Sequence, residues 1–380
     1  MKQSMERILT THVGSLPRSQ AVTDVVFTKD RGSLTEDQDY AGTIRSAVMD
    51  VVQKQVDTGI DIVSDGEMSK ISYATYISDR LTGFAGDTPR EPGQDLLDFP
   101  RFMKKLADHG DTAQYKRPRC VGEITVKNTE DVEVDLANLT SAANAAGATG
   151  VFMNAASPGV IALFQPNDFY ATQDDYLEAV AEAMRSEYEA IVAAGVTLQI
   201  DAPDFGMGRH TMYKDRSVKD YLKLAGTHVE VLNHALRNIP PEQARMHMCW
   251  GNYEGPHHHD IEMKYLLPVV LQVNVQALLF EGANPRHAHE WKVIKDIEIP
   301  DDKILIPGVL DTTSNYVEHP ELVADRICNY ASIVGRERVI AGTDCGFGTF
   351  AGFGPIDPDI VYLKLAALVE GAQLASERLW

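Results

Sequence analysis

The sequence has 380 residues and a formal net charge of −20 at pH 7, so a nucleic-acid backbone or an anionic membrane surface would repel it. Its four cysteines are too few and too scattered for a disulfide scaffold, which favours a reducing compartment. No run approaches the ~18 apolar residues of a membrane span, and no secretory segment opens the chain. We therefore expect a soluble, cytoplasmic protein with small-molecule partners, and the composition leaves a homo-oligomer open.

Short apolar runs alternate with amphipathic helical patterns along most of the chain. The first predicted strand covers residues 8–14 and leads into a turn at residues 15–18. A helix is predicted at residues 43–58, because apolar side chains recur there at helical spacing and Gly59 ends it. Residues 60–67 form a second predicted strand that runs into a polar end.

The pattern weakens between about residues 81 and 146, and we interpret this region as an insertion that folds over one end of a single domain covering residues 1–380. Residues 119–126 are its one candidate strand. Alternation then resumes, with predicted strands at 150–157, 196–201, 244–250, 276–281, 304–311 and 339–345, and helices at 176–194, 218–236 and 357–373.

With the insertion set aside, the chain contains eight strand-then-helix units, which predicts the α/β class and a closed (β/α)8 TIM barrel. An open doubly wound sheet is the alternative, but no Gly-x-Gly-x-x-Gly turn follows the first strand. In such barrels the sites are built at the carboxyl ends of the strands. The polar or thiol residues at these predicted ends are Ser15, Glu67, Ser157, Asp201, Cys249, Glu281, Asp311 and Cys345.

His247 and Cys249 lie two residues apart in a predicted strand, so their side chains point to the same face. Glu281 and Cys345 end two other runs, and a barrel gathers such ends around one axis. Mixed sulfur and nitrogen ligation selects zinc over magnesium or calcium. We predict that these four residues hold one Zn²⁺, which activates a substrate thiol as thiolate, the nucleophilic form. The alternative is that the cysteines are small buried hydrophobic residues.

Other polar residues have less specific interpretations. Glu67 and Asp201 could grip an ammonium group, or they could cap helices. His257–His259 could cover a substrate or bind a second metal, although adjacent loop histidines usually face solvent. The basic residues best placed for an anionic ligand, with surface ion pairs as the alternative, are Arg18, Arg119, Arg209 and His210.

The ordered series of these motifs resembles the C-terminal catalytic barrel of cobalamin-independent methionine synthase across nearly the whole chain. The motifs that carry the resemblance are Thr11–Arg18, Ser64–Glu67, Gln199–Asp201, His247–Cys249, Glu281 and Asp344–Gly346. The resemblance implies that His247, Cys249, Glu281 and Cys345 bind the catalytic zinc. It also implies that Ser15, Glu67 and Asp201 hold the amino end of homocysteine. We add Arg18 and Ser157 as candidate substrate-binding residues, and Glu281 and Asp311 as candidate catalytic residues, since the glutamate is the weakest ligand and would yield to an incoming sulfur.

The sequence departs from the family pattern at positions that the resemblance associates with the folate donor. Thr313 stands where the family has a histidine proposed to act as an acid, and Asp201-Ala202-Pro203 replaces an aspartate-glutamate-proline motif. Single-barrel relatives include core methionine synthases and epoxyalkane:coenzyme M transferase. The leading hypothesis is zinc-dependent alkyl transfer to a small thiol, with homocysteine favoured and the donor, a folate, a corrinoid or another compound, left open. The alternatives are epoxide opening by a coenzyme M thiolate, a zinc hydrolase and a structural zinc barrel.

Overall fold

The computed structural model describes residues 1–89, 91–109 and 116–380. Eight parallel strands form its main sheet: β1 (Leu9–Thr10), β2 (Ile62–Val63), β5 (Gly150–Ala156), β6 (Thr197–Asp201), β7 (Ala244–Met248), β8 (Ala277–Phe280), β9 (Ile304–Leu310) and β10 (Ile340–Thr343). They pair in the order β1-β10-β9-β8-β7-β6-β5-β2. A parallel bridge between Thr11 and Ile62 joins β1 to β2 and closes the ring. The predicted (β/α)8 barrel is confirmed.

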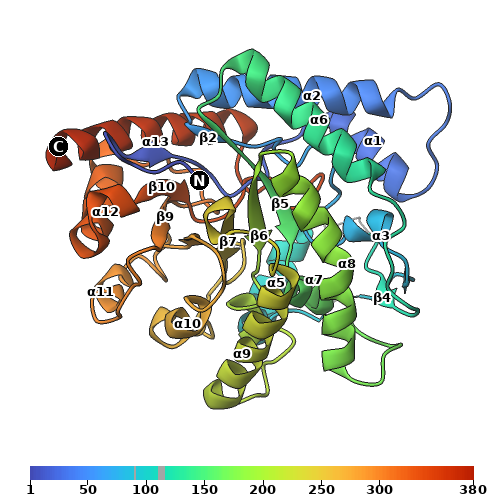
Figure 1. The fold of residues 1–380 in the computed structure, drawn as a ribbon. Coiled ribbons are helices and arrows are strands. Elements are labelled where there is room, and N and C mark those ends of the chain that lie inside the picture. The colour runs from blue at the N-terminus through green and yellow to red at the C-terminus, as the bar shows by residue number, and fades with distance from the viewer. Residues whose placement is uncertain (90, 110–115) are drawn as a thin grey trace.

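Helices surround this ring (Figure 1). The helices of the wall are α1 (Gln20–Asp30), α2 (Tyr40–Thr58), α6 (Glu130–Ala146), α7 (Pro158–Phe164), α8 (Gln173–Ala193), α9 (Val218–Ala235), α10 (Met263–Val270), α11 (Trp291–Ile294), α12 (Pro320–Val334) and α13 (Pro358–Leu379). The helices predicted from apolar spacing are confirmed to within a few residues, because their apolar stripes face the strands. For example, Ile44, Val48 and Val51 of α2 are buried, and Gly59 ends that helix with a φ of 95°. In the part of the chain that the structure describes, no helix has the length and apolar character needed to cross a membrane.

The barrel interior is packed rather than hollow. Its apolar side chains come from alternate positions of several strands and include Leu9, Val13, Ile62, Phe152, Leu279, Ile306 and Ile340. Arg245 of β7 also lies inside: its guanidinium lies over the ring of Phe152 at 3.7 Å and donates to the Thr11 hydroxyl at 3.1 Å. Because this layer fills the interior, a ligand site can form only at an end of the barrel.

The predicted boundaries of the insertion, 81–146, are wrong at the carboxyl side. Helix α6 belongs to the barrel wall, where it packs against α2 and α8. The insertion proper lies between β2 and α6 and carries α3 (Ile77–Arg80), β3 (Phe84–Ala85), α4 (Gln94–Leu97), α5 (Pro100–His109) and β4 (Arg119–Cys120), of which β3 and β4 pair antiparallel. The predicted strand at 119–126 is thus only two residues long, and residues 90 and 110–115 lie outside the described part. The prediction failed because α6 is rich in alanine and asparagine, which weakens its apolar periodicity.

Candidate active site

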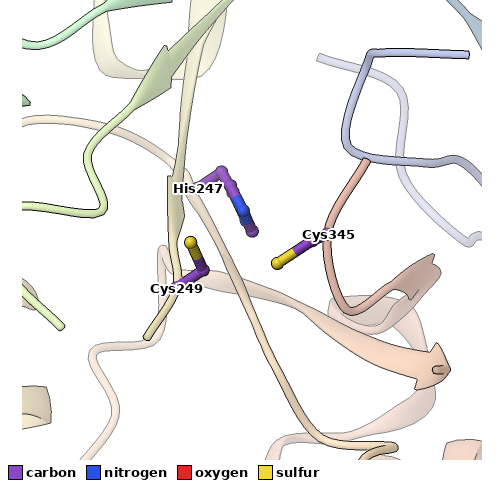
Figure 2. A group of neighbouring side chains, drawn as sticks. All are labelled: His247, Cys249 and Cys345. Atoms are coloured by element: carbon purple, nitrogen blue, oxygen red, sulfur yellow. The ribbon is translucent and has the colours of Figure 1, made fainter. Parts of the chain in front are cut away.

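Three of the predicted metal ligands meet at the carboxyl end of the barrel. Strand β7 carries His247 and leads into Cys249, and β10 leads into Cys345 (Figure 2). One ligand atom from each side chain lies within 4.8 Å of the other two, and all three residues are buried. Both cysteines are free thiols. Nδ1 of His247 is buried and has no hydrogen-bond partner among the described residues. Two thiols that form no disulfide and an imidazole with an unpartnered Nδ1 are a donor set that zinc selects, so the residues fit that ion.

Burial determines the protonation of these groups. It lowers the pKa of His247 to about 3, with a smaller contribution from the nearby charge of Arg245, so the imidazole is neutral and keeps a lone pair for a metal. Burial and the neighbouring Cys249 thiol raise the pKa of Cys345 well above its ordinary value. A bound cation reverses this preference, because a coordinating thiol is deprotonated outright.

Glu281, the fourth predicted ligand, follows β8 and lies beside the other three. Its Oε1 is 3.8 Å from the Cys345 sulfur and accepts a hydrogen bond from the Trp250 amide at 2.7 Å. Its Oε2 accepts from the Asn284 side chain at 2.6 Å. Each carboxylate oxygen has two acceptor positions, so Glu281 retains the capacity to coordinate, and its role as a ligand stays a prediction.

Asp344 fixes the position of Glu281 relative to Cys345. Its carboxylate accepts three backbone hydrogen bonds of 2.8 Å from the loop that follows Glu281, namely from Gly282, Ala283 and Asn284. A Cβ at Gly308 would lie 2.1 Å from Asp344 Oδ1, so only glycine fits there. The motif analysis placed Asp344 next to a ligand but gave it no role, and the carboxylate directly before Cys345 was the available signal.

Glu67 and Asp201 line the same cavity as the two cysteines and His247. Asp201 is paired with His247 across β6 and β7, and its two oxygens accept from Asn154 at 2.8 Å and Gln199 at 2.9 Å. Oε2 of Glu67 is buried without a partner in the described chain. Burial raises the pKa of Glu67 to about 8 and that of Asp201 to about 6. Two buried carboxylates, one with a free oxygen, suit a positively charged ligand group.

Ser15 also lines the cavity, but Arg18 does not. The Arg18 guanidinium donates to the backbone carbonyls of Glu67 at 2.7 Å, Lys70 at 3.1 Å and Gly348 at 2.6 Å. Glu67 has a φ of 58°, a left-handed conformation that is unfavourable for a residue with a side chain. Arg18 therefore holds the strained backbone that presents Glu67, and the structure does not bring it to the cavity as a substrate-binding residue.

Ser157 and Asp311 also lie outside the residues that line the cavity. The Ser157 hydroxyl accepts from the amide of Val160 at 2.9 Å and thereby caps α7, and it donates to Asp204 at 2.7 Å. Asp311 Oδ1 accepts from both the amide and the hydroxyl of Thr313. Their observed contacts are those of a helix cap and a turn.

The cavity has a volume of about 380 Å³. The aromatic residues of its wall are Tyr73, Phe164, Tyr253, Phe350 and Phe353. Of the basic residues considered for an anionic ligand, His210 lines this cavity. Arg119 instead pairs with Asp168, and Arg209 donates to the carbonyl of Lys214. The cavity therefore combines thiols, carboxylates and the histidines His210 and His247 within a largely aromatic wall.

The three histidines at 257–259 have different surroundings. His257 contacts Asp260 at 2.9 Å and the carbonyl of Tyr253 at 3.0 Å. His258 and His259 lie at the surface and share one oxygen of Asp98, at 2.9 and 2.6 Å. Asp98, His258 and His259 form a second group with ligand atoms within 4.8 Å of one another.

An eight-stranded parallel barrel with thiols and an imidazole at its carboxyl rim defines a class of barrel enzymes built for thiol chemistry. The family model for the catalytic domain of cobalamin-independent synthase matches residues 8–91 and 112–353. This chain belongs to the cobalamin-independent methionine synthase family, which confirms the resemblance seen in the sequence.

Individual relatives agree in fold and extent. The chain is 26% identical over 373 residues to a methionine synthase from Saccharolobus solfataricus, covering 97% of this chain and 95% of the relative. It is 24% identical over 376 residues to a methionine synthase from Sulfurisphaera tokodaii, covering 97% and 93%. A B12-independent methionine synthase from Shewanella sp. W3-18-1, solved in complex with selenomethionine, has the same fold, with a TM-score of 0.74, 19% identity and coverage of 98% and 99%.

Proposed function

We propose that this protein is a zinc-dependent methyltransferase that alkylates the thiol of homocysteine. The observation that carries the proposal is the convergence of His247, Cys249 and Cys345, whose ligand atoms lie within 4.8 Å of one another in a cavity that also contains Glu67 and Asp201. The relatives named methionine synthase support the same reaction. The acidic composition and free cysteines support a cytoplasmic location.

Two groups of residues have separate roles in the proposed reaction. His247, Cys249 and Cys345 would hold zinc, with Glu281 as the fourth ligand. When bound, zinc keeps a substrate thiol deprotonated at neutral pH and so makes its sulfur nucleophilic. Because a free thiol has a pKa near 8.5, only a few per cent is thiolate at pH 7 without this help.

Glu67, Asp201 and Ser15 would bind the amino end of homocysteine. An ammonium group stabilises the ionised form of these buried carboxylates, and the unpartnered Oε2 of Glu67 provides a free acceptor. Asp201 is paired with His247 in the sheet, so an amino acid held there has its side chain beside the thiol cluster. The donors from Asn154 and Gln199 hold the Asp201 carboxylate in one orientation.

Epoxide opening by coenzyme M is the second candidate. One observation favours it: Arg117 lies on the cavity wall and could meet a sulfonate. That guanidinium is already 3.2 Å from the carboxylate of Asp87. A sulfonate would also approach Glu67 and Asp201, and, unlike an ammonium group, it cannot stabilise the ionised form of these carboxylates. The two carboxylates therefore favour homocysteine.

The test is metal analysis followed by X-ray absorption with each thiol. The purified protein should contain about one zinc per chain, and homocysteine should add a sulfur to the zinc coordination while coenzyme M should not. Turnover is then screened with homocysteine and a panel of methyl donors and short epoxides. Absence of a new zinc–sulfur distance with homocysteine would contradict the proposal.

A further inference from the structure

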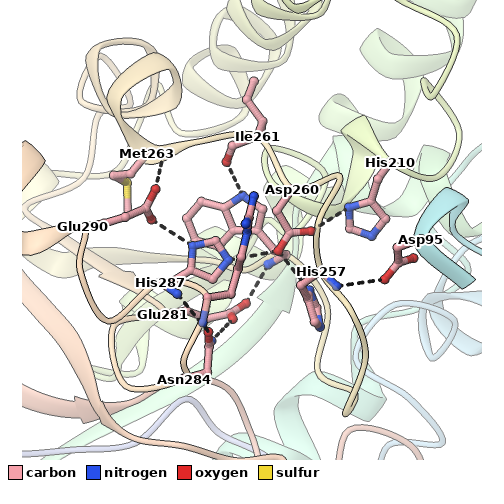
Figure 3. Close-up of polar contacts among 12 residues, drawn as sticks. Asp95, His210, His257, Asp260, Ile261, Met263, Glu281, Asn284, His287 and Glu290 are labelled. Carbon is pink, nitrogen blue, oxygen red and sulfur yellow. Dashed lines mark hydrogen bonds and ion pairs between the residues drawn. The ribbon is translucent and has the colours of Figure 1, made fainter.

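Asp260, in the segment between β7 and α10, is buried and contacts three histidines (Figure 3). Its Oδ1 lies 3.1 Å from Nδ1 of His210. Its Oδ2 lies 2.9 Å from Nδ1 of His257 and 3.0 Å from Nε2 of His287. These histidines come from three different segments of the chain, so only the folded protein brings them to one carboxylate.

Two of the three imidazoles have a partner at both nitrogens. Nε2 of His257 contacts the carbonyl of Tyr253, and Nδ1 of His287 contacts Glu290 at 2.9 Å. His210 is different: its Nδ1 lies within ion-pair distance of Asp260 Oδ1, and neither of its buried nitrogens has a hydrogen bond among the described residues. The His210 side chain is 1% exposed. Of the three histidines, His210 is also the one whose side chain lines the cavity.

The charges of the cluster favour an ionised Asp260. Burial lowers the pKa of His257, but the hydrogen bond to Asp260, the charges of Asp260 and Glu281 and the contact with the Tyr253 carbonyl together outweigh it and raise the pKa to about 8. In the same way, Asp260 and Glu290 outweigh burial and raise the pKa of His287 to about 10. Burial would raise the pKa of Asp260, yet its contacts with His210, His257 and His287 bring it well below its ordinary value. The Asp260 carboxylate lies 3.1 Å from Nδ1 of His210, in the position of an aspartate that orients a catalytic histidine.

The backbone of the segment around Gly93 packs against His210. The backbone carbonyl of His210 accepts from the amide of Gln94 at 2.8 Å. Gly93, which also lines the cavity, lies beside the ring, and a Cβ there would come within 3.1 Å of Cδ2 and 3.6 Å of Nε2. The backbone of Gly93, with no side chain, therefore forms the part of the cavity wall beside the buried Nε2 edge.

We propose that His210, oriented by Asp260, is a catalytic acid that protonates the leaving atom of the alkyl donor. The inference rests on the proposed alkyl transfer to homocysteine. As the thiolate sulfur forms a bond to the alkyl carbon, the bond from that carbon to nitrogen or oxygen breaks, and its electron pair stays on the nitrogen or oxygen. The Nε2 proton passes to that atom, and the neutral imidazole regains a proton from water. The donor class is therefore one with a basic nitrogen or oxygen leaving atom, since a sulfonium releases a neutral sulfide and needs no acid.

The experiment compares leaving groups in the zinc-loaded enzyme with homocysteine as acceptor. The probes are methyltetrahydrofolate and epoxypropane, which leave through nitrogen and oxygen, S-methylmethionine, which leaves as a sulfide, and iodomethane, which leaves as iodide. In H210N the amide retains a donor near the Nδ1 position but has no acid at Nε2. We expect H210N to lower turnover of the nitrogen or oxygen donor by about a hundredfold or more and to leave the rates with iodomethane and S-methylmethionine nearly unchanged.

His257→Gln is the matched control, because His257 shares Asp260 but does not line the cavity. It should lower all rates in the same proportion, and zinc content and circular dichroism check that each variant is folded. If H210N proves unfolded, D260N takes its place. It should likewise lower turnover of the nitrogen or oxygen donor relative to turnover of iodomethane and S-methylmethionine. Equal losses with all donors in H210N, or wild-type turnover with the sulfonium alone, would overturn the role of His210 while leaving methyl transfer intact. Absence of wild-type turnover with every probe would instead overturn the proposed function.

Discussion

Among the residues that the structure describes, two groups of side chains lie close enough together to hold a metal ion, and they differ in almost everything else. The cavity group, His247, Cys249 and Cys345, is buried, and Nδ1 of its histidine has no partner among the described residues. The surface group consists of Asp98, His258 and His259. There each histidine already contacts Asp98, and these hydrogen bonds, from His259 and then His258, lower the pKa of the carboxylate.

The difference shows that proximity alone does not define a metal centre. At the surface, imidazole and carboxylate satisfy each other and water, and a metal ion would have to displace those partners. In the cavity the Cys345 thiol has Cys249 and the Glu281 carboxylate as neighbours, and the buried Nδ1 of His247 has no partner among the described residues. That arrangement is stabilised when a cation binds. The predictions below test this contrast, from the largest expected effect to the smallest.

Cys249→Ser and Cys345→Ser should each abolish stoichiometric zinc binding and methyl transfer. The affinity loss should exceed the roughly 10–100-fold that removal of an outer partner of a metal ligand costs, because a primary ligand is removed. Zinc per chain by mass spectrometry and turnover with homocysteine measure the effect. The matched control is the double variant H258A/H259A, which should retain one zinc and wild-type turnover, and a loss of zinc there would reverse the assignment of the two groups.

Glu67→Gln should raise the KM for homocysteine by about 10–100-fold, since a hydrogen bond to a charged group contributes roughly 1.5–3 kcal/mol. The zinc content should not change, because Glu67 lines the cavity without belonging to the thiol cluster. Steady-state kinetics and titration calorimetry measure the effect. The surface variant D98N is the control, and an unchanged KM in E67Q would remove Glu67 from the substrate site.

Glu281→Gln distinguishes a catalytic from a structural zinc. The amide keeps the shape and can still accept from Trp250, but it is a poor ligand, so we expect turnover to fall about tenfold or more. The melting temperature should move by only a few degrees. Stopped-flow kinetics and calorimetry provide the two readouts. A large drop in melting temperature with unchanged turnover would indicate a closed structural site.

The ligand-free protein should lose stability as the pH rises from about 4.5 to about 8. Burial raises the pKa of Glu67 from 4.5 to about 8, so in this range the folded state binds more protons than the unfolded state, and stability falls with pH. Thermal melts across this range measure the effect. E67Q should have a flatter profile, and homocysteine should restore stability at the upper end by supplying an ammonium group. A wild-type profile in E67Q would contradict the assignment of this dependence to Glu67.

The sequence by itself determined the architecture and predicted which residues would gather as candidate metal ligands. Apolar periodicity and glycine caps are local signals, so they located the barrel strands and most of the helices. The positions of His247, Cys249, Glu281 and Cys345 at strand ends follow from the same patterns, because a parallel barrel brings those ends to one rim.

Only the tertiary structure decided which strand-end residues face the cavity. Arg18, Ser157 and Asp311 lie at the expected rim, but Arg18 donates to a backbone carbonyl, Ser157 caps a helix and Asp311 accepts from Thr313 in a turn. The direction of a side chain past the end of a strand depends on the local backbone. The wall helix α6 was likewise recognisable only from its packing.

The contact of His210 with Asp260 joins residues that no local pattern connects, since they lie in segments that follow different strands. The raised pKa values of Glu67 and Asp201 come from desolvation, a property of the surrounding fold. Spacing along a chain predicts which residues reach the same rim, but burial and orientation arise only when the whole barrel has closed around them.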